Sequence, residues 1–281
     1  MSRLTSGGNM RLPQPVDDGL IIPAVGSWSR EKHHFLLRYV DAFTNAMKDK
    51  RWSGLHYIDL FAGAGIERVE DTGAIEWGSP LIAAQAGYPF KRLHLCELDR
   101  LKFAALCARV NVIRGSADQI LNGDANEMIA EIVTSIPARS LSLAFLDPYG
   151  LHLAYSTLER LSRIRADLII FFPDRLDANR NWEAYYRDNP DSNLDSVLGP
   201  GSNWREEIGT ARQQRRLDKF RELYVRQIRK LGYKFFEREP IPNKGAPLYS
   251  LIFCSKEEVA LKIWRGISLI KPGGQRTLGF E

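Results

Sequence analysis

Short runs of apolar residues alternate with amphipathic stretches along the first two thirds of the chain. Five runs have the length and apolar content of buried strands: LHYIDLFAGAG, RLHLCELD, QILNGDAN, LSLAFLDPYG and ADLIIFFPD. The segments between them carry apolar residues three and four positions apart, which is typical of helices packed by one face. This alternation predicts a parallel sheet with helices on both of its faces.

Helix-start signals place the ends of several segments. A first helix is expected over residues 28–50, with Ser29 as its N-cap. Another is expected to begin at Ser79-Pro80, because proline is favoured at the first helical position. Residues 65–78, which precede it, are then expected to form a long loop, and long loops in compact domains are often functional.

The last third of the chain has a different pattern. Residues 175–209 are rich in Asn, Asp, Arg and aromatic residues, and we expect a helical and irregular insertion that lies over the sheet edge instead of in the core. A basic helix is expected over residues 210–231 and a final helix over residues 256–267. Between them, the strands GYKFFEREPI and PLYSLIFCS are expected to close the sheet as an antiparallel hairpin. The predicted fold class is therefore α/β, with a doubly wound, mostly parallel sheet.

Composition agrees with one domain of this kind. The 281 residues are 44% apolar, enough for a single large core. Residues 1–26, rich in Gly, Pro and Ser, are expected to be a mobile lead-in, and residues 27–281 a single domain. There is no run of about 18 apolar residues and no apolar N-terminal leader, so we expect a cytoplasmic protein without a membrane span.

The cysteines argue against a disulfide framework, a metal site and a covalent cysteine mechanism. Cys96, Cys107 and Cys254 lack the paired spacing of a disulfide framework or a zinc cluster. No His/Cys cluster occurs along the sequence, so no catalytic metal is expected. No cysteine follows the proline after the fourth predicted strand, so a covalent cysteine mechanism of the cytosine-C5 type lacks its nucleophile.

The net charge of +5 is unevenly distributed. Residues 205–234 contain ten Lys or Arg and four Asp or Glu, so this segment alone exceeds the surplus of the whole chain. Four basic residues share one face of the predicted helix: Arg212, Arg215, Arg216 and Lys219. A basic face beside a ligand cleft suits the phosphate backbone of a nucleic acid, whereas the alternative is an ordinary solvated helix surface.

Acidic residues end the first three predicted strands. Asp59 precedes Gly63 and Gly65, and glycines after a buried strand let the backbone approach a ligand closely. Glu97 ends the second strand, where a carboxylate can hold a ribose diol, and Asp124 ends the third, where it can accept from an adenine amino group. Each has a structural alternative, a tight turn or a helix N-cap. The three together mark the carboxyl edge, where open α/β sheets bind ligands.

The fourth strand ends in Asp147-Pro148-Tyr149-Gly150. The Asp147 carboxylate and the Pro148 carbonyl can each accept a hydrogen bond from an exocyclic amine, and Tyr149 offers a face for stacking a flat ring. The alternative is an ordinary type I turn with proline at its second position. The position at the end of a buried strand favours the catalytic interpretation.

These motifs together resemble a known family. DLFAGAG, CELD, GDAN and DPYG fall in the order and strand positions of class I S-adenosylmethionine-dependent methyltransferases, a resemblance that covers roughly residues 57–254. More narrowly, the chain resembles the three-Cys-motif partner family, with its lysine-bearing N-terminal helix (EKHHFLLRY), its D-x-F-A-G-x-G turn, Gly78-Ser79-Pro80 and D-P-[FY]-G. The tetrapeptide DPYG is closer to the D-P-F-G of enzymes that resemble tRNA guanine-N2 methyltransferases than to D-P-P-Y.

The resemblance implies a Rossmann-like methyltransferase fold, S-adenosyl-L-methionine as cofactor, and a partner resembling radical enzymes with a three-cysteine iron–sulfur motif. The residues expected to bind the cofactor are Asp59, Phe61, Gly63, Gly65, Glu97, Asp124 and Ala125. The leading hypothesis is a methyltransferase that acts on an amine of a nucleobase in nucleic acid. The alternatives are a non-catalytic partner subunit of a radical iron–sulfur enzyme, and a methyltransferase for a small molecule or peptide.

Overall fold

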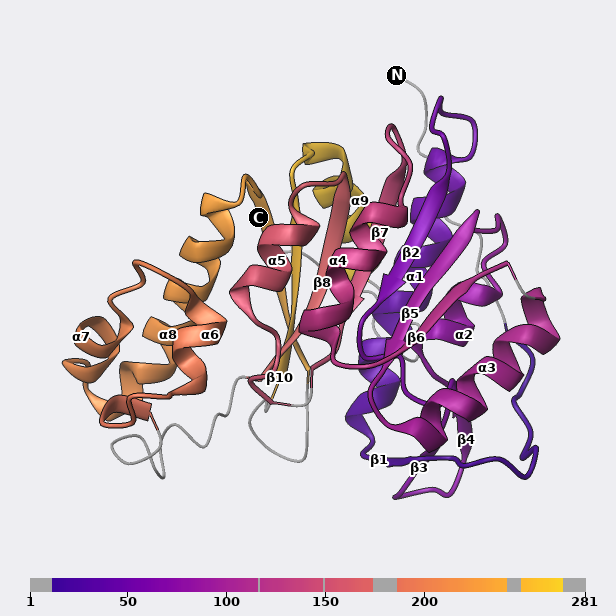
Figure 1. Ribbon diagram of the computed structural model, residues 1–281, viewed down its shortest axis with the longest axis horizontal. Coiled ribbons are helices and arrows are strands. Elements are labelled where there is room, and N and C mark those ends of the chain that lie inside the picture. Colours follow the sequence, from indigo (N-terminus) through magenta and orange to yellow (C-terminus); the bar gives the residue numbers. More distant parts are fainter. Residues whose placement is uncertain (1–11, 116, 149, 174–185, 242–248, 270–281) are drawn as a thin grey trace.

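A seven-stranded sheet forms the centre of the molecule (Figure 1). The computed structural model describes residues 12–115, 117–148, 150–173, 186–241 and 249–269. The strands of the sheet are β2 (Leu55–Asp59), β5 (Arg92–Glu97), β6 (Gln119–Asn122), β7 (Leu141–Leu146), β8 (Ala166–Pro173), β9 (Phe235–Ile241) and β10 (Tyr249–Ser255). Their order is β6-β5-β2-β7-β8-β10-β9, and only β10 runs antiparallel to its neighbours. The predicted fold class, including the C-terminal antiparallel hairpin, is confirmed.

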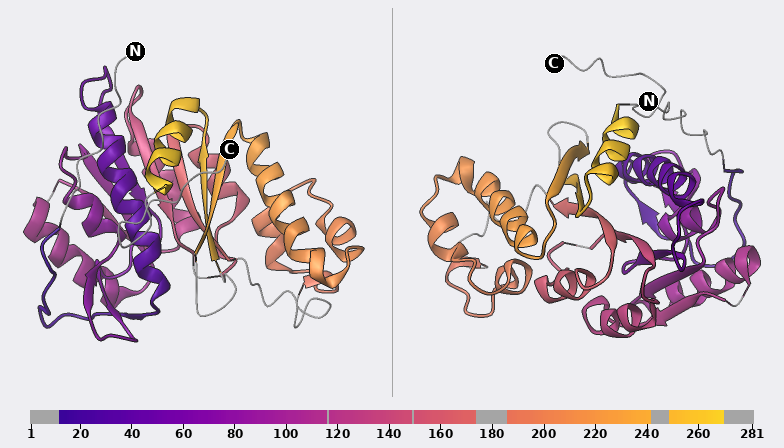
Figure 2. Two further views of the ribbon diagram at one scale, coloured as in Figure 1. Left: turned by 180° about the vertical axis from the view of Figure 1, so that it is seen from behind. Right: turned by 90° about the horizontal axis from the view of Figure 1, so that it is seen from above.

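Helices cover both faces of this sheet, as Figure 2 shows from above. One face is covered by α1 (Trp28–Met47), α2 (Ser79–Ala84), α3 (Arg100–Arg114) and α9 (Glu258–Ser268). The other is covered by α4 (Ala125–Ser135), α5 (Tyr155–Leu161), α6 (Asn193–Leu198), α7 (Trp204–Gly209) and α8 (Gln213–Lys230). Successive strand residues alternate between the two cores, as Tyr57 and Ile58 do in β2. In the described residues no helix is both long and apolar enough to cross a membrane.

The expected insertion at residues 175–209 is helical where the structure describes it, from residue 186. Its helices α6 and α7 bury Leu198 and Trp204 in the same core as the sheet, instead of only lying over its edge. The following helix α8 packs Phe220 on Phe172 of β8, with 5.0 Å between the ring centres. The helices α6 to α8 therefore extend the core sideways beyond β8 (Figure 1).

The expectation that residues 65–78 form a loop is wrong, because this segment contains two strands. These are β3 (Ile66–Val69) and β4 (Ile75–Trp77), paired antiparallel around a turn at Gly73, whose φ is +67°. A two-residue strand, β1 (Ala24–Val25), adds to β3 in parallel and completes a second small sheet. Strands of two to four residues are too short to show a clear alternation, so their apolar pattern could not be read.

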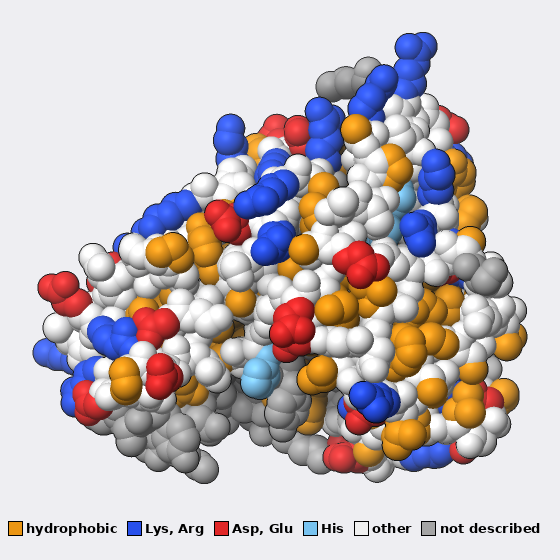
Figure 3. Space-filling model, viewed as in Figure 1, with side chains coloured by type: hydrophobic (Ala, Val, Ile, Leu, Met, Phe, Trp, Pro, Cys, Tyr) orange, Lys and Arg blue, Asp and Glu red, His pale blue; other side chains and the backbone are white. Residues whose placement is uncertain are grey.

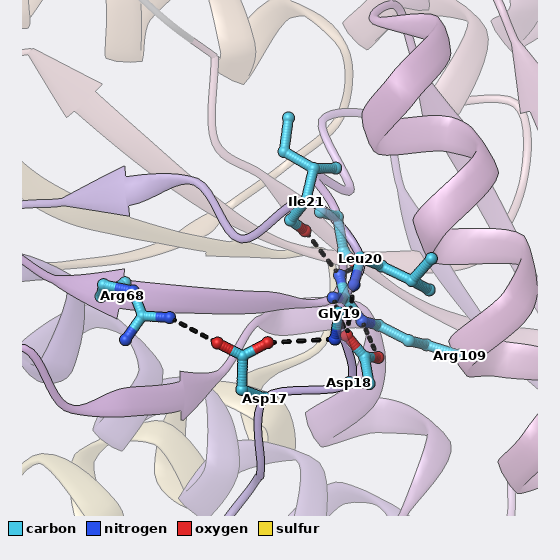
Figure 4. Close-up of polar contacts among 8 residues, drawn as sticks. Asp17, Asp18, Gly19, Leu20, Ile21, Arg68 and Arg109 are labelled. Carbon is cyan, nitrogen blue, oxygen red and sulfur yellow. Dashed lines mark hydrogen bonds and ion pairs between the residues drawn. The ribbon is translucent and has the colours of Figure 1, made fainter.

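The chain before β1 is attached to the rest of the fold by polar contacts (Figure 4). Asp18 accepts two hydrogen bonds from Arg109 of α3, at 2.7 and 2.8 Å, and Asp17 pairs with Arg68 at 2.9 Å. Arg109 is 6% exposed and also donates to the carbonyls of Ile21 and Ala64. Within the expected lead-in of residues 1–26, the described part from residue 12 is thus joined to the end of β2, and residues 1–11 lie outside the description.

The contrast between the two neighbouring aspartates gives a prediction about stability. Asp18→Asn leaves the buried Arg109 guanidinium without its carboxylate, and we expect a loss of about 1–3 kcal/mol in the free energy of unfolding. The matched control Asp17→Asn breaks an exposed pair, which contributes little. Urea unfolding of the two variants and the parent measures the difference. Equal stability of Asp18→Asn and the control would show that the Asp18 contact does not hold this segment.

Candidate functional site

Four neighbouring strands end in acidic residues at one edge of the sheet, the lower edge in Figure 1. In sheet order, Asp124 follows β6, Glu97 ends β5, Asp59 ends β2 and Asp147 follows β7. Adjacent strands lie about 4.8 Å apart, so the four ends form a row roughly 15 Å long. The structure therefore brings together the four acidic residues that the sequence singled out along 89 positions of chain.

A glycine turn follows β2 and meets the end of β5. Gly63 and Gly65 both have positive φ angles, +64° and +90°, which favour glycine. A side chain at Gly63 would meet no atom within 4 Å, so open space lies above the backbone there. Glu97, 9% exposed, accepts from the Gly63 amide through one oxygen and from the Asp99 amide through the other, each at 2.8 Å. The Glu97 carboxylate thus joins the two strand ends.

Asp59 lies beneath this turn and is wholly buried. Its carboxylate accepts from the Phe61 amide and from the Tyr57 hydroxyl, both at 3.2 Å. Burial raises the pKa of Asp59 to about 7, although these hydrogen bonds and one from Ser79 oppose the shift. Asp59 is therefore bonded to the chain's own donors and supports the turn from the core side.

Asp124 is the N-cap of α4. Its carboxylate accepts from the Asn126 amide at 2.7 Å, and Ala125 is buried as the first residue of the helix. Asp99 caps α3 in the same way, accepting from the amides of Leu101 and Lys102. The structural alternative named for Asp124, a helix cap, is therefore present, and the carboxylate also lies at the end of the row beside β6.

Asp147 pairs with a lysine from the other end of the sequence. The ammonium of Lys32, in the first turns of α1, lies 2.5 Å from Oδ2 of Asp147, and Lys32 is 6% exposed. Burial by itself would lower the pKa of Lys32, but the charges of Asp147 and Glu67 outweigh it and raise that pKa above its ordinary value. The Lys32 ammonium is therefore charged at neutral pH.

Further polar groups surround Lys32. Glu67 of β3 accepts a hydrogen bond from the Ser29 hydroxyl, and its carboxylate lies 3.7 Å from Nδ1 of His33. Burial lowers the pKa of His33 to about 4, so this ring is neutral at pH 7. The expectation that Ser29 caps the first helix is wrong, because α1 begins earlier, with Ser27 at the N-cap. The Ser29 hydroxyl donates a hydrogen bond to Glu67 instead.

Sequence reasoning missed Lys32 and Glu67 as members of this site. The signal for Lys32 was the motif EKHHFLLRY, which shows a lysine but not its partner, 115 positions away. Glu67 stood in the segment expected to be a loop.

In the described residues, no three His, Cys, Asp or Glu side chains are arranged to hold a metal ion.

The remaining predicted residues flank Asp147. Pro148 is buried and lines a small hollow together with Phe172 of β8 and Tyr224 of α8. Gly150 has a φ of +70°, and Tyr149 lies outside the described residues.

The basic face expected on α8 lies on the flank of this edge, since Phe220 and Tyr224 of the same helix pack on the end of β8. Arg212 and Arg215 are exposed, and Arg216 is half-buried. Lys219 forms an ion pair with Glu222 at 2.7 Å, so part of the charge on this face is already compensated.

Comparison with known proteins shows the fold and leaves the family open. The sequence matches no protein-family model and no curated protein. The Legionella pneumophila protein LPL1258, from the family DUF519, is 14% identical over 88% of this chain and 94% of its own, with a TM-score of 0.50. NodS, an N-methyltransferase from Bradyrhizobium japonicum WM9, is 14% identical over 82% and 97% of the two chains, with a TM-score of 0.43. Trm1 from Pyrococcus horikoshii, solved with S-adenosyl-L-methionine, is 13% identical over 89% and 62%, with a TM-score of 0.44. The class that the fold defines is the Rossmann-like α/β class.

The pKa of Asp59 gives a prediction about pH. Its carboxyl group has a pKa of 3.8 when unperturbed and about 7 in the folded protein, so folding favours the protonated form. This contribution to stability is complete below about pH 4, falls as the pH rises toward 7, and is lost above it. Asp59→Asn cannot ionise, and we expect the free energy of unfolding to fall less steeply from pH 4 to 7 than in the parent, by up to about 1.4 kcal/mol per pH unit. Urea unfolding at five pH values, with Asp17→Asn as the control, measures it; parallel curves for parent and Asp59→Asn would contradict the assignment.

Proposed function

We propose that this chain is an S-adenosylmethionine-dependent methyltransferase that methylates an amine nitrogen of a nucleobase in nucleic acid. One observation carries the proposal: the spatial order of the acidic strand ends. Moving along the edge from β6 to β7, Asp124, Glu97, the glycine turn and Asp147 follow one another. Adenine, ribose, methionine and target amine would follow one another in the same order.

The residues present fit this cofactor. Gly63 leaves open space above the turn, so a ligand can approach the backbone closely. Phe61, Gly63 and Gly65 would line the methionine part, with Asp59 holding the turn from beneath. Glu97 would accept from the ribose hydroxyls, because each of its oxygens receives only one hydrogen bond and retains a lone pair. Asp124 and Ala125 would lie against the adenine.

Asp147 would orient the reacting amine. S-adenosylmethionine, when bound, would supply an electrophilic methyl group, which the amine nitrogen would take from sulfur with the thioether as the leaving group. Lys32 holds Oδ2 of Asp147, which leaves Oδ1 to accept a hydrogen from the amine, while the Pro148 carbonyl accepts the other. Two such bonds direct the lone pair toward the methyl carbon, and the Asp147 carboxylate gives the departing proton a path to solvent. Tyr149 would stack on the base.

The positive charge of α8 supports a nucleic acid as the substrate. Arg212 and Arg215 are exposed beside the edge of the site, and Arg216 and Lys219 lie on the same helix face. Cations in this position suit the phosphates next to a target base. A small-molecule substrate would not need them.

A second candidate function, a non-catalytic partner subunit of a radical iron–sulfur enzyme, has one observation in its favour. The buried pair of Lys32 and Asp147 satisfies both charges without any substrate, as a purely structural pair does. The resemblance to the three-Cys-motif partner family points to the same kind of partner. Methyl transfer by the chain, alone or with that partner, distinguishes the two.

The cofactor assignment predicts a loss of affinity. Glu97→Ala removes two acceptors for the ribose, and we expect S-adenosylmethionine to bind about 1.5–3 kcal/mol more weakly, roughly 10-fold to 150-fold in the dissociation constant. Titration calorimetry measures it. The control is Glu127→Ala, which removes an exposed carboxylate one helical turn beyond the row. If Glu97→Ala binds the cofactor as tightly as the control, the ribose assignment is wrong.

The assignment of Asp147 predicts a change in turnover instead of affinity. Asp147→Asn is expected to reduce methyl transfer to bulk RNA or DNA at least about 100-fold, because orientation of the amine is lost, with cofactor affinity within about threefold of the parent. Lys32→Met is expected to reduce methyl transfer at least about tenfold with cofactor affinity unchanged, because Oδ2 of Asp147 loses the ammonium that holds it in place.

The readout is transfer of a labelled methyl group, with cofactor calorimetry on the same preparations. Full activity of Asp147→Asn with intact binding would remove Asp147 from the mechanism. Full activity of Lys32→Met would show that Lys32 does not position Asp147 for the reaction. A parent protein that binds the cofactor yet methylates nothing, even with a partner enzyme, would favour the second candidate.

A further inference from the structure

The opposite edge of the sheet, where its parallel strands begin, carries a dense group of positive charges. Four loops lead into β5, β2, β7 and β8. Together with Arg92, the first residue of β5, they contain eight Lys or Arg and a single acidic residue, Asp49. We call this group the amino-edge basic surface; its members are Lys48, Lys50, Arg51, Lys91, Arg92, Arg139, Arg163 and Arg165. Figure 3 shows Lys and Arg side chains along the upper edge of the molecule, over these strand starts.

The four loops meet around Ser53. Its amide donates to the Arg139 carbonyl at 3.1 Å, and its own carbonyl accepts from the Lys91 ammonium at 3.0 Å. Beside it, the Arg165 guanidinium lies 5.7 Å from the centre of the Trp52 ring. Residues that are more than 100 positions apart in sequence therefore form one continuous surface.

The charges of this surface are uncompensated. All of its members except the half-buried Arg92 are exposed, and none forms an ion pair with another described residue. On α8, by contrast, Lys219, Arg221 and Arg226 all pair with acidic side chains. The amino edge thus carries eight cations without an ion pair to a described residue, and they lie outside the basic segment of residues 205–234.

Helix ends explain only part of this accumulation. Each of the four loops follows the C-terminus of a helix, α1, α2, α4 or α5, and such an end carries a partial charge of about −0.5 that attracts cations. Four ends amount to roughly −2, against a surplus of seven positive side-chain charges in these loops and Arg92 together. A large positive potential remains after this compensation, so the surface is expected to bind an external anion.

The arrangement fits a linear polyanion. The strands β5, β2, β7 and β8 are neighbours in the sheet, and each is preceded by at least one unpaired cation, which spaces the cations about 4.8 Å apart in a row roughly 14 Å long. Tyr88, 38% exposed, lies in one of these loops and offers a face for stacking a base. Tyr88 is the only large apolar side chain exposed in the described residues of these loops, too little to insert into a bilayer.

We propose that the amino-edge basic surface binds the phosphate backbone of a nucleic acid. This surface is separate from the acidic edge, because β8 alone, with eight residues, puts about 26 Å between the two ends of the sheet. The proposal goes beyond the methyl-transfer reaction and does not depend on it. A strand that touches both edges would need about eight stacked nucleotides at roughly 3.4 Å each to cover this distance.

The test measures binding of two probes by fluorescence anisotropy between 50 and 200 mM KCl: a labelled 30-nucleotide RNA of mixed sequence and a labelled 30-base-pair DNA duplex. The variant is Arg51→Gln with Lys91→Gln and Arg163→Gln, from three of the four loops. The matched control is Arg226→Gln with Lys262→Gln and Arg265→Gln, which removes the same charge from residues already in surface ion pairs. Thermal unfolding checks that both proteins are folded.

For the amino-edge variant we expect at least about tenfold weaker binding of one or both probes at 100 mM KCl. The slope of log affinity against log salt should become shallower by about 2, from three contacts at roughly 0.7 each. The control should keep the parent's slope. A third protein, Arg212→Gln with Arg215→Gln, measures the contribution of α8 separately.

Two results would overturn the proposal. One is an amino-edge variant that keeps the parent's slope with both probes, or that loses no more than the control does. The other is a variant that keeps RNA and DNA binding but no longer sediments with vesicles of 30% phosphatidylserine, which would assign the surface to membranes. Calorimetry on the same variant measures S-adenosylmethionine binding at the acidic edge separately. Failure of this proposal can therefore be distinguished from failure of the methyl-transfer proposal.

Discussion

The buried ion pair between Lys32 and Asp147 is the contact on which the arrangement of the site depends. Lys32 has lost most of its water, and a charge in that state is stable only where opposite charges and hydrogen bonds replace the water. Asp147 supplies one opposite charge from the main sheet, and Glu67 supplies another from the small sheet. Helix α1 is therefore held against both sheets at once, and Asp147 is held in place beside the other acidic strand ends.

Much of the fold could be predicted from the sequence because its strands are buried on both faces and its helices on one. β7 is a continuous apolar run with a carboxylate and a proline after it, so both its existence and its end were visible. The small sheet could not be predicted, because β1 has two residues and β4 has three. Segments this short form strands only when they pair with neighbouring strands. Trp204 shows the same limit: it lies in a polar, irregular segment and is buried only because α8 extends the core there.

The acidic strand ends of the candidate site were predictable from the sequence, whereas their hydrogen bonds and the members Lys32 and Glu67 were not. Parallel strands end at one edge, so Asp59, Glu97 and Asp124 were bound to be neighbours once the strands were known. The direction in which each carboxylate points depends on donors that no spacing reveals. Asp59 faces Tyr57 and the Phe61 amide in the core, and Glu97 bridges two strand ends.

The same topology separates charge across the molecule. Every parallel strand-helix unit places the N-terminus of a helix at the carboxyl edge and its C-terminus at the amino edge, so each edge has a partial charge of fixed sign. Asp99 and Asp124 cap the N-termini of α3 and α4, where the partial charge is positive. Arg139 and Arg163 follow the C-termini of α4 and α5, where it is negative. At the carboxyl edge this complementarity is local, because each cap carboxylate bonds to helix amides. At the amino edge the cations outnumber what the helix ends can balance. The sheet therefore presents an acidic, hydrogen-bonded edge suited to a small ligand with donor groups and a basic edge suited to an extended anion.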